Sequence, residues 1–414
     1  FQALDSHFTW VYFSRHVTIE PENLTLLANR ATTYQQMEDF DNALADYQTI
    51  LELEPAVASV YKRVGDLQFQ LGEYQAALDA YTQAIVLEPT LTSAIFNRGI
   101  VNFENENLEA AIADFKEVIA LEPENSDAHK RLADAYYLSE KVPQAIYEYN
   151  QAIDLNPADV LSLFNLGRAH SSLGNTELAI SYYDRAIEQY PEFAIALNNR
   201  GELYLRAGEF DRALDDFEQA AQLDPTYDMA VYNTGLTYYY KSEYESAIEQ
   251  FTKAIEINPE SLDAYYQRGL AYFQLSDYEI AITDWTYVIE QYPEYAQAYY
   301  SIGLAYYFQQ DYEQALALFA QTLTVDSQHG FAYYFRGNTY MSLSKYDLAI
   351  EDFTKAIALE TELGQAYYNR AVANYQSGFR YKAIDDFEMV LVTSEDADLI
   401  AQTESILVDL NALP

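Results

Sequence analysis

Apolar, small and polar residues alternate along the chain at helical spacing, and the whole pattern repeats every 34 residues. In each period an Ala is followed four positions later by an aromatic residue, which places both on one helical face. This aromatic column consists of Tyr47, Tyr81, Phe115, Tyr149, Tyr183, Phe217, Phe251, Trp285, Phe319, Phe353 and Phe387. A small residue, mostly Gly, occurs earlier in each period and would let a second helix approach closely. The pattern predicts one hairpin of two helices per period.

Proline marks the end of most periods. It cannot donate the next backbone hydrogen bond, so we expect the second helix of each hairpin to end there. The column consists of Pro21, Pro55, Pro89, Pro123, Pro157, Pro191, Pro225, Pro259 and Pro293. Ser327, Thr361 and Glu395 replace proline in the last three periods. We expect those three helix ends to be less sharply stopped.

The order of these columns resembles the tetratricopeptide repeat family. One period reads Tyr265, Arg268-Gly269, Tyr272, Ala281, Trp285 and Pro293. Eleven tandem copies keep the same phase over residues 24–397. The resemblance implies an all-α fold, a right-handed superhelical α-solenoid of antiparallel helix hairpins, in one continuous elongated domain.

The phase continues beyond both ends of this array. Residues 4–17 fall where a second helix is expected, and residues 398–411 where a first helix is expected. The predicted organisation is a half-repeat helix with a lead-in segment over 1–23, eleven repeats over 24–397, and a half-repeat or capping helix over 398–414. Docked head to tail, the half-repeats of two copies would complete one repeat and produce an open filament. The alternative is that they cap the solenoid. The candidate interface residues are Phe8, Trp10, Phe13, Leu399, Ile406 and Leu410.

The composition limits the partners. The chain has 65 acidic and 23 basic residues, a net charge of −42, which repels phosphate backbones and excludes nucleic acid as a partner. Other proteins, further copies of the chain, neutral glycans and divalent cations stay open as partners. The absence of Cys excludes disulfides and thiolate metal sites. No apolar run approaches the ~20 residues that span a bilayer.

Nothing in the sequence indicates catalysis, a cofactor or a metal site. No two of the five His lie at ligand spacing, and glycines occur at repeat pitch rather than in a phosphate-binding loop. His170 is predicted to be a packed residue on a helix face. Acidic pairs such as Asp215-Asp216 and Asp385-Asp386 are predicted to lie on a solvated face. We therefore predict a non-enzymatic protein.

The resemblance implies that the first helix of each hairpin lines an inner groove, with its second, fifth, ninth and twelfth positions exposed. An exposed aromatic stripe of this extent is typical of a binding site, and the alternative is that the hairpins bury these rings. The aromatic candidates are Tyr232, Tyr266, Tyr300, Tyr334 and Tyr368 at the fifth position and Tyr239, Phe273 and Tyr307 at the twelfth. The sixth position adds Asn97, Asn165, Asn199, Asn233 and Asn369, which would hold either a peptide backbone or the neighbouring helix.

Two functions follow as hypotheses. The first is protein–protein interaction through the aromatic groove, and the second is a structural subunit that assembles head to tail into an extracellular filament. The Cys-free, acidic, Tyr-rich composition slightly favours the cell surface or the extracellular space over the cytoplasm. The sequon at Asn23 is a candidate N-glycosylation site.

Overall fold

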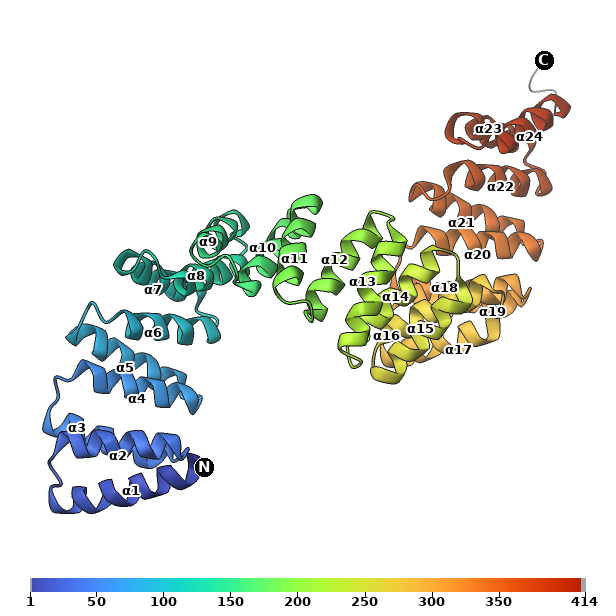
Figure 1. The fold of residues 1–414 in the computed structure, drawn as a ribbon. Helices are drawn as coiled ribbons and strands as arrows, with labels where there is room; N and C mark the ends of the chain where they lie inside the picture. Colours follow the sequence, from blue (N-terminus) through green and yellow to red (C-terminus); the bar gives the residue numbers. More distant parts are fainter. Residues whose placement is uncertain (1, 411–414) are drawn as a thin grey trace. The chain divides into compact units, whose positions relative to one another are not determined.

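The computed structural model describes residues 2–410, with side chains from residue 9 onward. These residues form 24 α-helices, and no strand occurs among them (Figure 1). The first twelve are α1 (Gln2–Ile19), α2 (Leu24–Gln36), α3 (Phe40–Leu53), α4 (Ala58–Gln70), α5 (Tyr74–Leu87), α6 (Thr92–Glu104), α7 (Leu108–Leu121), α8 (Ser126–Leu138), α9 (Val142–Leu155), α10 (Val160–Ser172), α11 (Thr176–Gln189) and α12 (Ala194–Arg206).

The remaining helices continue the same alternation. They are α13 (Phe210–Leu223), α14 (Asp228–Tyr240), α15 (Tyr244–Ile257), α16 (Leu262–Gln274), α17 (Tyr278–Gln291), α18 (Ala296–Phe308), α19 (Tyr312–Val325), α20 (Gly330–Ser342), α21 (Tyr346–Ala358), α22 (Leu363–Gln376), α23 (Arg380–Thr393) and α24 (Ala397–Asp409). From α2 onward the even-numbered helices are the first helices of hairpins and the odd-numbered ones the second. The predicted fold class, an all-α solenoid of antiparallel hairpins, is confirmed.

The chain divides into two compact units, Phe1–Leu203 and Tyr204–Pro414. The organisation predicted from the repeats, with eleven repeats over 24–397 between two terminal half-repeats, stays a prediction. In a solenoid each hairpin packs mainly on its neighbours, so the period of the sequence does not reveal where a unit ends.

The core follows the repeated columns. Each aromatic residue of the second helices is almost fully buried, and the Ala four positions earlier has no exposed surface. The small residue of the first helix faces this ring: a Cβ atom on Gly269 would lie 2.5 Å from Nε1 of Trp285. Close approach of the two helices therefore explains why this column holds only Gly or Ala.

The prediction about the proline-free ends is wrong for α19 and α23. α19 and α23 end at the same repeat position as the helices that precede a proline, and α21 ends one residue earlier. After α19 the Asp326 carboxylate accepts from the amide of Gln328 at 2.9 Å, and after α23 the Ser394 hydroxyl accepts from that of Asp396 at 3.1 Å. After α21 the chain turns through Glu360, which has a left-handed backbone with φ 55°. Local turn bonds and backbone geometry thus stop these helices without proline.

An Arg–Asp pair recurs inside the hairpins and was not predicted. The guanidinium of Arg268 on α16 donates to both carboxylate oxygens of Asp284 on α17, at 2.9 and 2.7 Å, and to the Thr252 hydroxyl of the preceding hairpin at 3.1 Å. The same Arg and Asp columns pair in Arg30–Asp46, Arg98–Asp114, Arg336–Asp352 and Arg370–Asp386.

The carboxylates of these pairs are buried, including that of Asp386, which is 6% exposed. Asp216 of the other acidic pair is also buried, at 5%. The prediction of a solvated face is therefore confirmed for Asp215 and Asp385, which are exposed, and wrong for Asp216 and Asp386. In each acidic pair one carboxylate points into the hairpin, because consecutive helical residues point about 100° apart.

Candidate functional site

The fifth-position tyrosines are less accessible than the sequence suggests. Tyr266, Tyr300 and Tyr334 are each 8% exposed, and Tyr232 and Tyr368 are half-buried. Each ring packs on the core aromatic of its own hairpin: Tyr300 lies 6.1 Å from Phe319 between ring centroids. The expectation of an open stripe at this position is therefore corrected, because the second helix supplies a large ring on which the tyrosine rests.

Loop residues cover these rings further. Tyr295, which precedes α18, meets Tyr266 edge-on at 5.3 Å, and His329, which precedes α20, lies 4.7 Å from Tyr300. Burial raises the pKa of the Tyr232 hydroxyl to about 12. These rings form a rigid layer beneath the first-helix surface.

The twelfth and thirteenth positions of three successive first helices carry accessible rings. Tyr239, Phe273 and Tyr307 are half-buried at the C-terminal ends of α14, α16 and α18, whereas Tyr240 and Phe308 are 60% and 50% exposed. We call Tyr239, Tyr240, Phe273, Tyr307 and Phe308 the aromatic strip. Three of the residues predicted from the sequence thus belong to the aromatic strip. The two most exposed members, Tyr240 and Phe308, were not predicted.

The aromatic strip is continuous from one first helix to the next. The Gln274 amide donates to the Tyr239 hydroxyl at 3.5 Å and connects α16 to α14. Phe308 packs edge-on against Phe273 at 5.7 Å and against Tyr307 at 5.5 Å, which connects α16 to α18. Tyr278, the first residue of α17, stacks on Phe308 with an interplanar angle of 12°. Ring contacts therefore join α16 to α18, and the Gln274 amide joins this surface to the rings of α14.

The side chains of the asparagine column form hydrogen bonds mainly with other residues of the protein. Asn97 donates to Asp66 at 2.8 Å, and Asn369 donates to Asn338 at 2.8 Å, in each case on the preceding first helix. Asn199 is hydrogen bonded to the Tyr183 hydroxyl, and Asn233 is 5% exposed. This geometry favours the interhelix role of the column over a ladder for a peptide.

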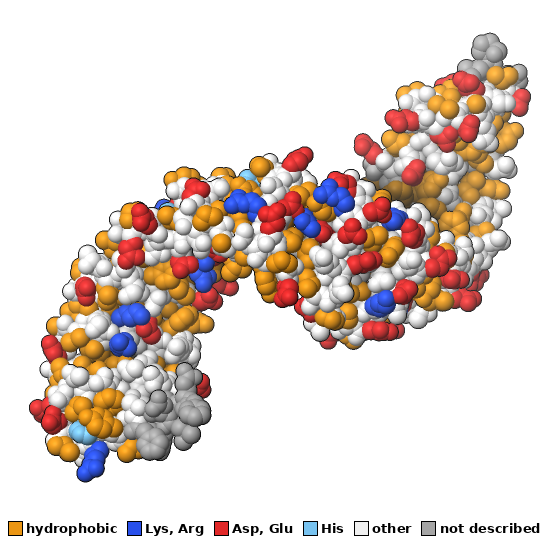
Figure 2. All heavy atoms as spheres, viewed as in Figure 1, with side chains coloured by type: hydrophobic (Ala, Val, Ile, Leu, Met, Phe, Trp, Pro, Cys, Tyr) orange, Lys and Arg blue, Asp and Glu red, His pale blue; other side chains and the backbone are white. Residues whose placement is uncertain are grey.

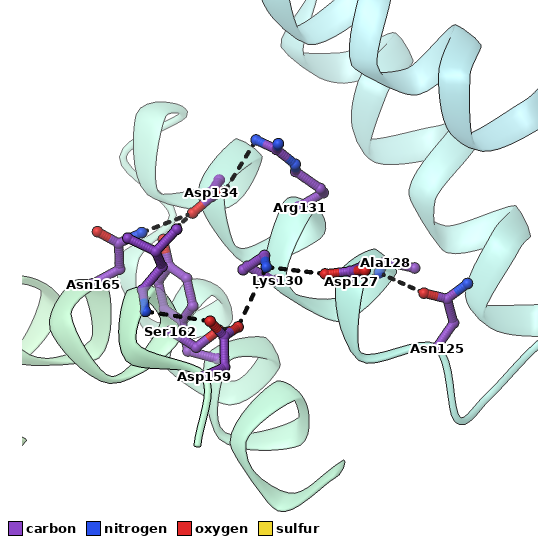
Figure 3. Close-up of polar contacts among 11 residues, drawn as sticks. Asn125, Asp127, Ala128, Lys130, Arg131, Asp134, Asp159, Ser162 and Asn165 are labelled. Atoms are coloured by element: carbon purple, nitrogen blue, oxygen red, sulfur yellow. Dashed lines mark hydrogen bonds and ion pairs between the residues drawn. The ribbon is translucent and has the colours of Figure 1, made fainter. Parts of the chain in front are cut away.

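The fifth member of the column, Asn165, belongs to a polar cluster in residues 1–203 (Figure 3). Asp134 on α8 accepts from Asn165 on α10 at 3.1 Å and from the Tyr149 hydroxyl at 2.6 Å, and Arg131 lies 3.9 Å away. Burial raises the pKa of the Asp134 carboxyl above its ordinary value. Beside it, Lys130 pairs with carboxylates on both sides in the view, Asp127 and Asp159. The charges of this cluster largely neutralise one another.

The candidate interface residues at the two ends pack within their own chain. Trp10 meets Tyr34 edge-on at 6.4 Å, Phe13 is half-buried, and Leu399 is 7% exposed. Ile406 and Leu410 are half-buried and line an open hollow of about 270 Å³ with Val372, Tyr375, Phe387 and Asp409. The side chain of Phe8 lies outside the described residues. Leu399 is a core residue, and this packing agrees with a capping role.

Other candidate chemistry is explained by local structure. His170 is buried and stacks on Tyr182, as the sequence predicts, and burial lowers its pKa. The Asn23 carboxamide caps α2 by accepting from the Leu26 amide, and it donates to Glu20; its glycosylation stays a prediction. Within residues 2–410 no group of three His, Asp or Glu is arranged to hold a metal ion. Among the described helices, none combines the length and hydrophobicity that a membrane crossing requires.

Fold and surface together define an all-α protein of tandem helix hairpins with a first-helix surface rich in aromatic residues. Sequence models described as tetratricopeptide repeat match residues 29–91, 164–228 and 266–329, and related ones match 92–125, 133–174, 235–276 and 331–360. The chain belongs to the tetratricopeptide repeat family, as the sequence predicts. Its fold is that of a protein-interaction scaffold, and no model of a catalytic family matches.

Solved structures with related architecture include three that illustrate the range. YrrB, described as a TPR protein with an unusual peptide-binding site, is 27% identical, with a TM-score of 0.40 over 45% of this chain and 96% of its own. A tetratricopeptide repeat protein from Parabacteroides merdae is 21% identical, with a TM-score of 0.47 over 60% and 98%. Yeast Tom70 is 15% identical, with a TM-score of 0.44 over 95% and 97%. No curated protein matches the chain.

Proposed function

We propose that this protein is a scaffold that binds extended segments of other proteins across the first helices of residues 204–414. The observation that carries the proposal is the continuous aromatic strip from Tyr239 to Phe308. Contiguous exposed apolar surface is typical of interaction sites, and Tyr and Phe anchors dominate the energetics of such surfaces.

The layer beneath the strip supports the proposal. The buried fifth-position rings, such as Tyr266 against Trp285 at 6.3 Å, leave the first helices little freedom to rearrange. A surface that is already ordered loses little conformational entropy when a partner binds. The strip is therefore suited to a partner that supplies the flexible component, namely an extended chain segment.

The test is a selection of random twelve-residue peptides on the full chain. The affinity of each recovered peptide is then measured for the wild type, for Phe308→Ala and for Tyr240→Ala. Tyr381→Ala is the matched control, because Tyr381 lies on α23 and is 85% exposed. We expect about tenfold weaker binding to the two strip variants, which corresponds to one lost aromatic contact, and unchanged binding to the control. Failure to recover peptides, or equal binding to all four proteins, would refute the proposal.

A second candidate function is end-to-end assembly of copies. In the internal hairpins the small residue of the first helix is buried against the second helix. In α24 the residue at the same position, Ser405, is exposed, and so are Ala401 and Val408 on the same face. This face would accept a second helix such as α1 of another copy. Light scattering over a range of concentrations tests the idea. An increase of the scattering mass with concentration that is abolished by Val408→Asp would support the idea. A monomer at all concentrations would contradict it.

A further inference from the structure

Acidic residues predominate around the aromatic strip. Residues 269–335 contain eight Asp or Glu and no Lys or Arg. Exposed carboxylates begin each second helix beside the strip: Glu243, Asp277 and Asp311 precede α15, α17 and α19. The face shown in Figure 2 likewise has more acidic (red) than basic (blue) side chains, with apolar side chains exposed between them. The strip is therefore an aromatic surface bordered by negative charge.

The basic residues closest in sequence to the strip either form ion pairs within the protein or lie at one end of the strip. Lys241, next to Tyr240, is 3.0 Å from Asp211 and 3.4 Å from Glu243. In the hairpin after the strip, Lys345 occupies the position that Asp277 and Asp311 hold within it. The surface between these two lysines therefore lacks its own free cations, and a partner would have to supply them.

Elsewhere in the repeats, aromatic rings of this protein lie under the guanidinium groups of its own arginines. The guanidinium carbon of Arg268 lies 5.4 Å from the centroid of Tyr265, and that of Arg336 lies 5.5 Å from that of Tyr333. In both cases a carboxylate holds the guanidinium, as Asp284 does for Arg268. A planar guanidinium suits this combination because it stacks on a ring and donates to a carboxylate at the same time.

The spacing of the strip limits how a partner can lie on it. α14 contacts α16, and Phe273 of α16 packs against Phe308 of α18. Helices in contact lie roughly 8–10 Å apart. A polyproline II segment has three residues per turn and rises about 3.1 Å per residue, so every third side chain projects from the same face at about 9 Å intervals. An extended segment therefore matches the spacing of the first-helix axes, with one contact per three residues.

We propose that the aromatic strip binds an extended segment of a partner protein that carries Arg at every third position. Each guanidinium would stack on the ring at the end of one first helix and donate to the carboxylate at the start of the following second helix. The inference rests on the proposed function, and it specifies the chemistry and the period of the ligand.

The experiment measures fluorescence anisotropy of labelled peptides on the full chain at low salt. The probe is (Arg-Pro-Pro)4, and the matched controls are four-Arg peptides with Arg at every second or every fourth position and the acidic peptide (Glu-Pro-Pro)4. We expect the every-third peptide to bind at least fivefold more tightly than either other spacing, and the acidic peptide not to bind. Phe308→Ala and the double variant Asp277→Asn, Asp311→Asn should each weaken it about tenfold, whereas Tyr381→Ala should not.

Equal affinity for all three Arg spacings would overturn the proposal, because attraction to the general negative charge does not depend on period. An affinity that is unchanged in Phe308→Ala would overturn it as well. If the random-peptide selection yields ligands that need Phe308 but lack Arg at this period, this inference fails and the proposed function stands. If no peptide of either kind binds, both fail.

Discussion

Arg268 shows how one side chain holds two hairpins. Its guanidinium bonds Asp284 of its own hairpin and Thr252 of the preceding one, and it covers the ring of Tyr265. Burial alone would lower its pKa, but the bonds with Asp284 outweigh this and hold the pKa above its ordinary value. The pair is therefore an internal element of the solenoid and not part of its binding surface.

Removal of Arg268 should destabilise residues 204–414 strongly. Arg268→Ala leaves the buried Asp284 carboxylate without its counter-ion, and we expect a loss of about 3 kcal/mol in the free energy of unfolding. The measurement is urea denaturation followed by Trp285 fluorescence in a Trp10→Phe background. Lys253→Ala is the control, because Lys253 and Glu249 form an exposed pair, and it should change stability by less than about 0.5 kcal/mol. Equal effects of the two substitutions on the free energy of unfolding would show that the Arg268–Asp284 pair does not contribute specially to stability.

Asp134 gives a prediction that depends on pH. Burial raises its pKa in the folded chain, so the folded state binds this proton more tightly than the unfolded chain and loses stability as the pH rises through the folded pKa. Asp134→Asn removes the charge and keeps an oxygen that accepts from Tyr149 and Asn165. The variant should be more stable than the wild type at pH 7, and the difference should shrink towards pH 4.

Urea denaturation of both proteins, followed by circular dichroism at several pH values, measures this difference. The effect of the other charges largely cancels in the comparison. A variant that is less stable than the wild type at pH 7, or a difference that grows on acidification, would contradict the assigned cause of the shift.

At the scale of the helix, the sequence predicts starts and ends closely. The eleven first helices begin at the first position of the predicted repeats, apart from α22, which begins one residue earlier. The turn between the two helices has a left-handed backbone at glycines such as Gly174. The same conformation occurs at Ser276 and Gln310, because the hairpin geometry imposes it on any residue there. Packing between two helices thus fixes a backbone conformation that local preference does not reveal.

Ser327 allows a test of the proline column. Proline occupies this column nine times in the chain, and its fixed φ restricts the unfolded state. Since α19 ends at the usual position without it, Ser327→Pro should add about 0.5–1 kcal/mol of stability. Thermal denaturation compared with Ser327→Ala measures the effect. A lower melting temperature for the proline variant would show that the loop after α19 differs from its counterparts.

At the scale of the whole molecule, the net charge of −42 opposes the compact state. Salt screens this repulsion over the Debye length. Raising NaCl from 20 to 500 mM should therefore stabilise the protein by about 1 kcal/mol, or about 2–4 °C for a unit of ~200 residues. Scanning calorimetry measures the shift. A constant or lower melting temperature would mean that the buried Arg–Asp pairs, rather than self-repulsion, dominate the electrostatics.

The aromatic strip was only partly predictable from the sequence. Tyr239, Phe273 and Tyr307 were identified from their repeat position alone. The burial of Tyr266 and its equivalents was left as an alternative, because it depends on how far a ring reaches towards the core aromatic of the partner helix. Tyr240 was overlooked because the thirteenth position varies between repeats and shows no column in the sequence.

The location of the partner on the chain tests the account most directly. The photo-crosslinking residue p-benzoylphenylalanine is introduced in place of Phe308 or, in a matched protein, in place of Tyr381, and each protein is irradiated with the tightest peptide from the random selection. The account predicts a covalent adduct at position 308 and none at position 381. Adducts at 381 alone, or at both positions with equal yield, would contradict the claim that the aromatic strip is the binding surface.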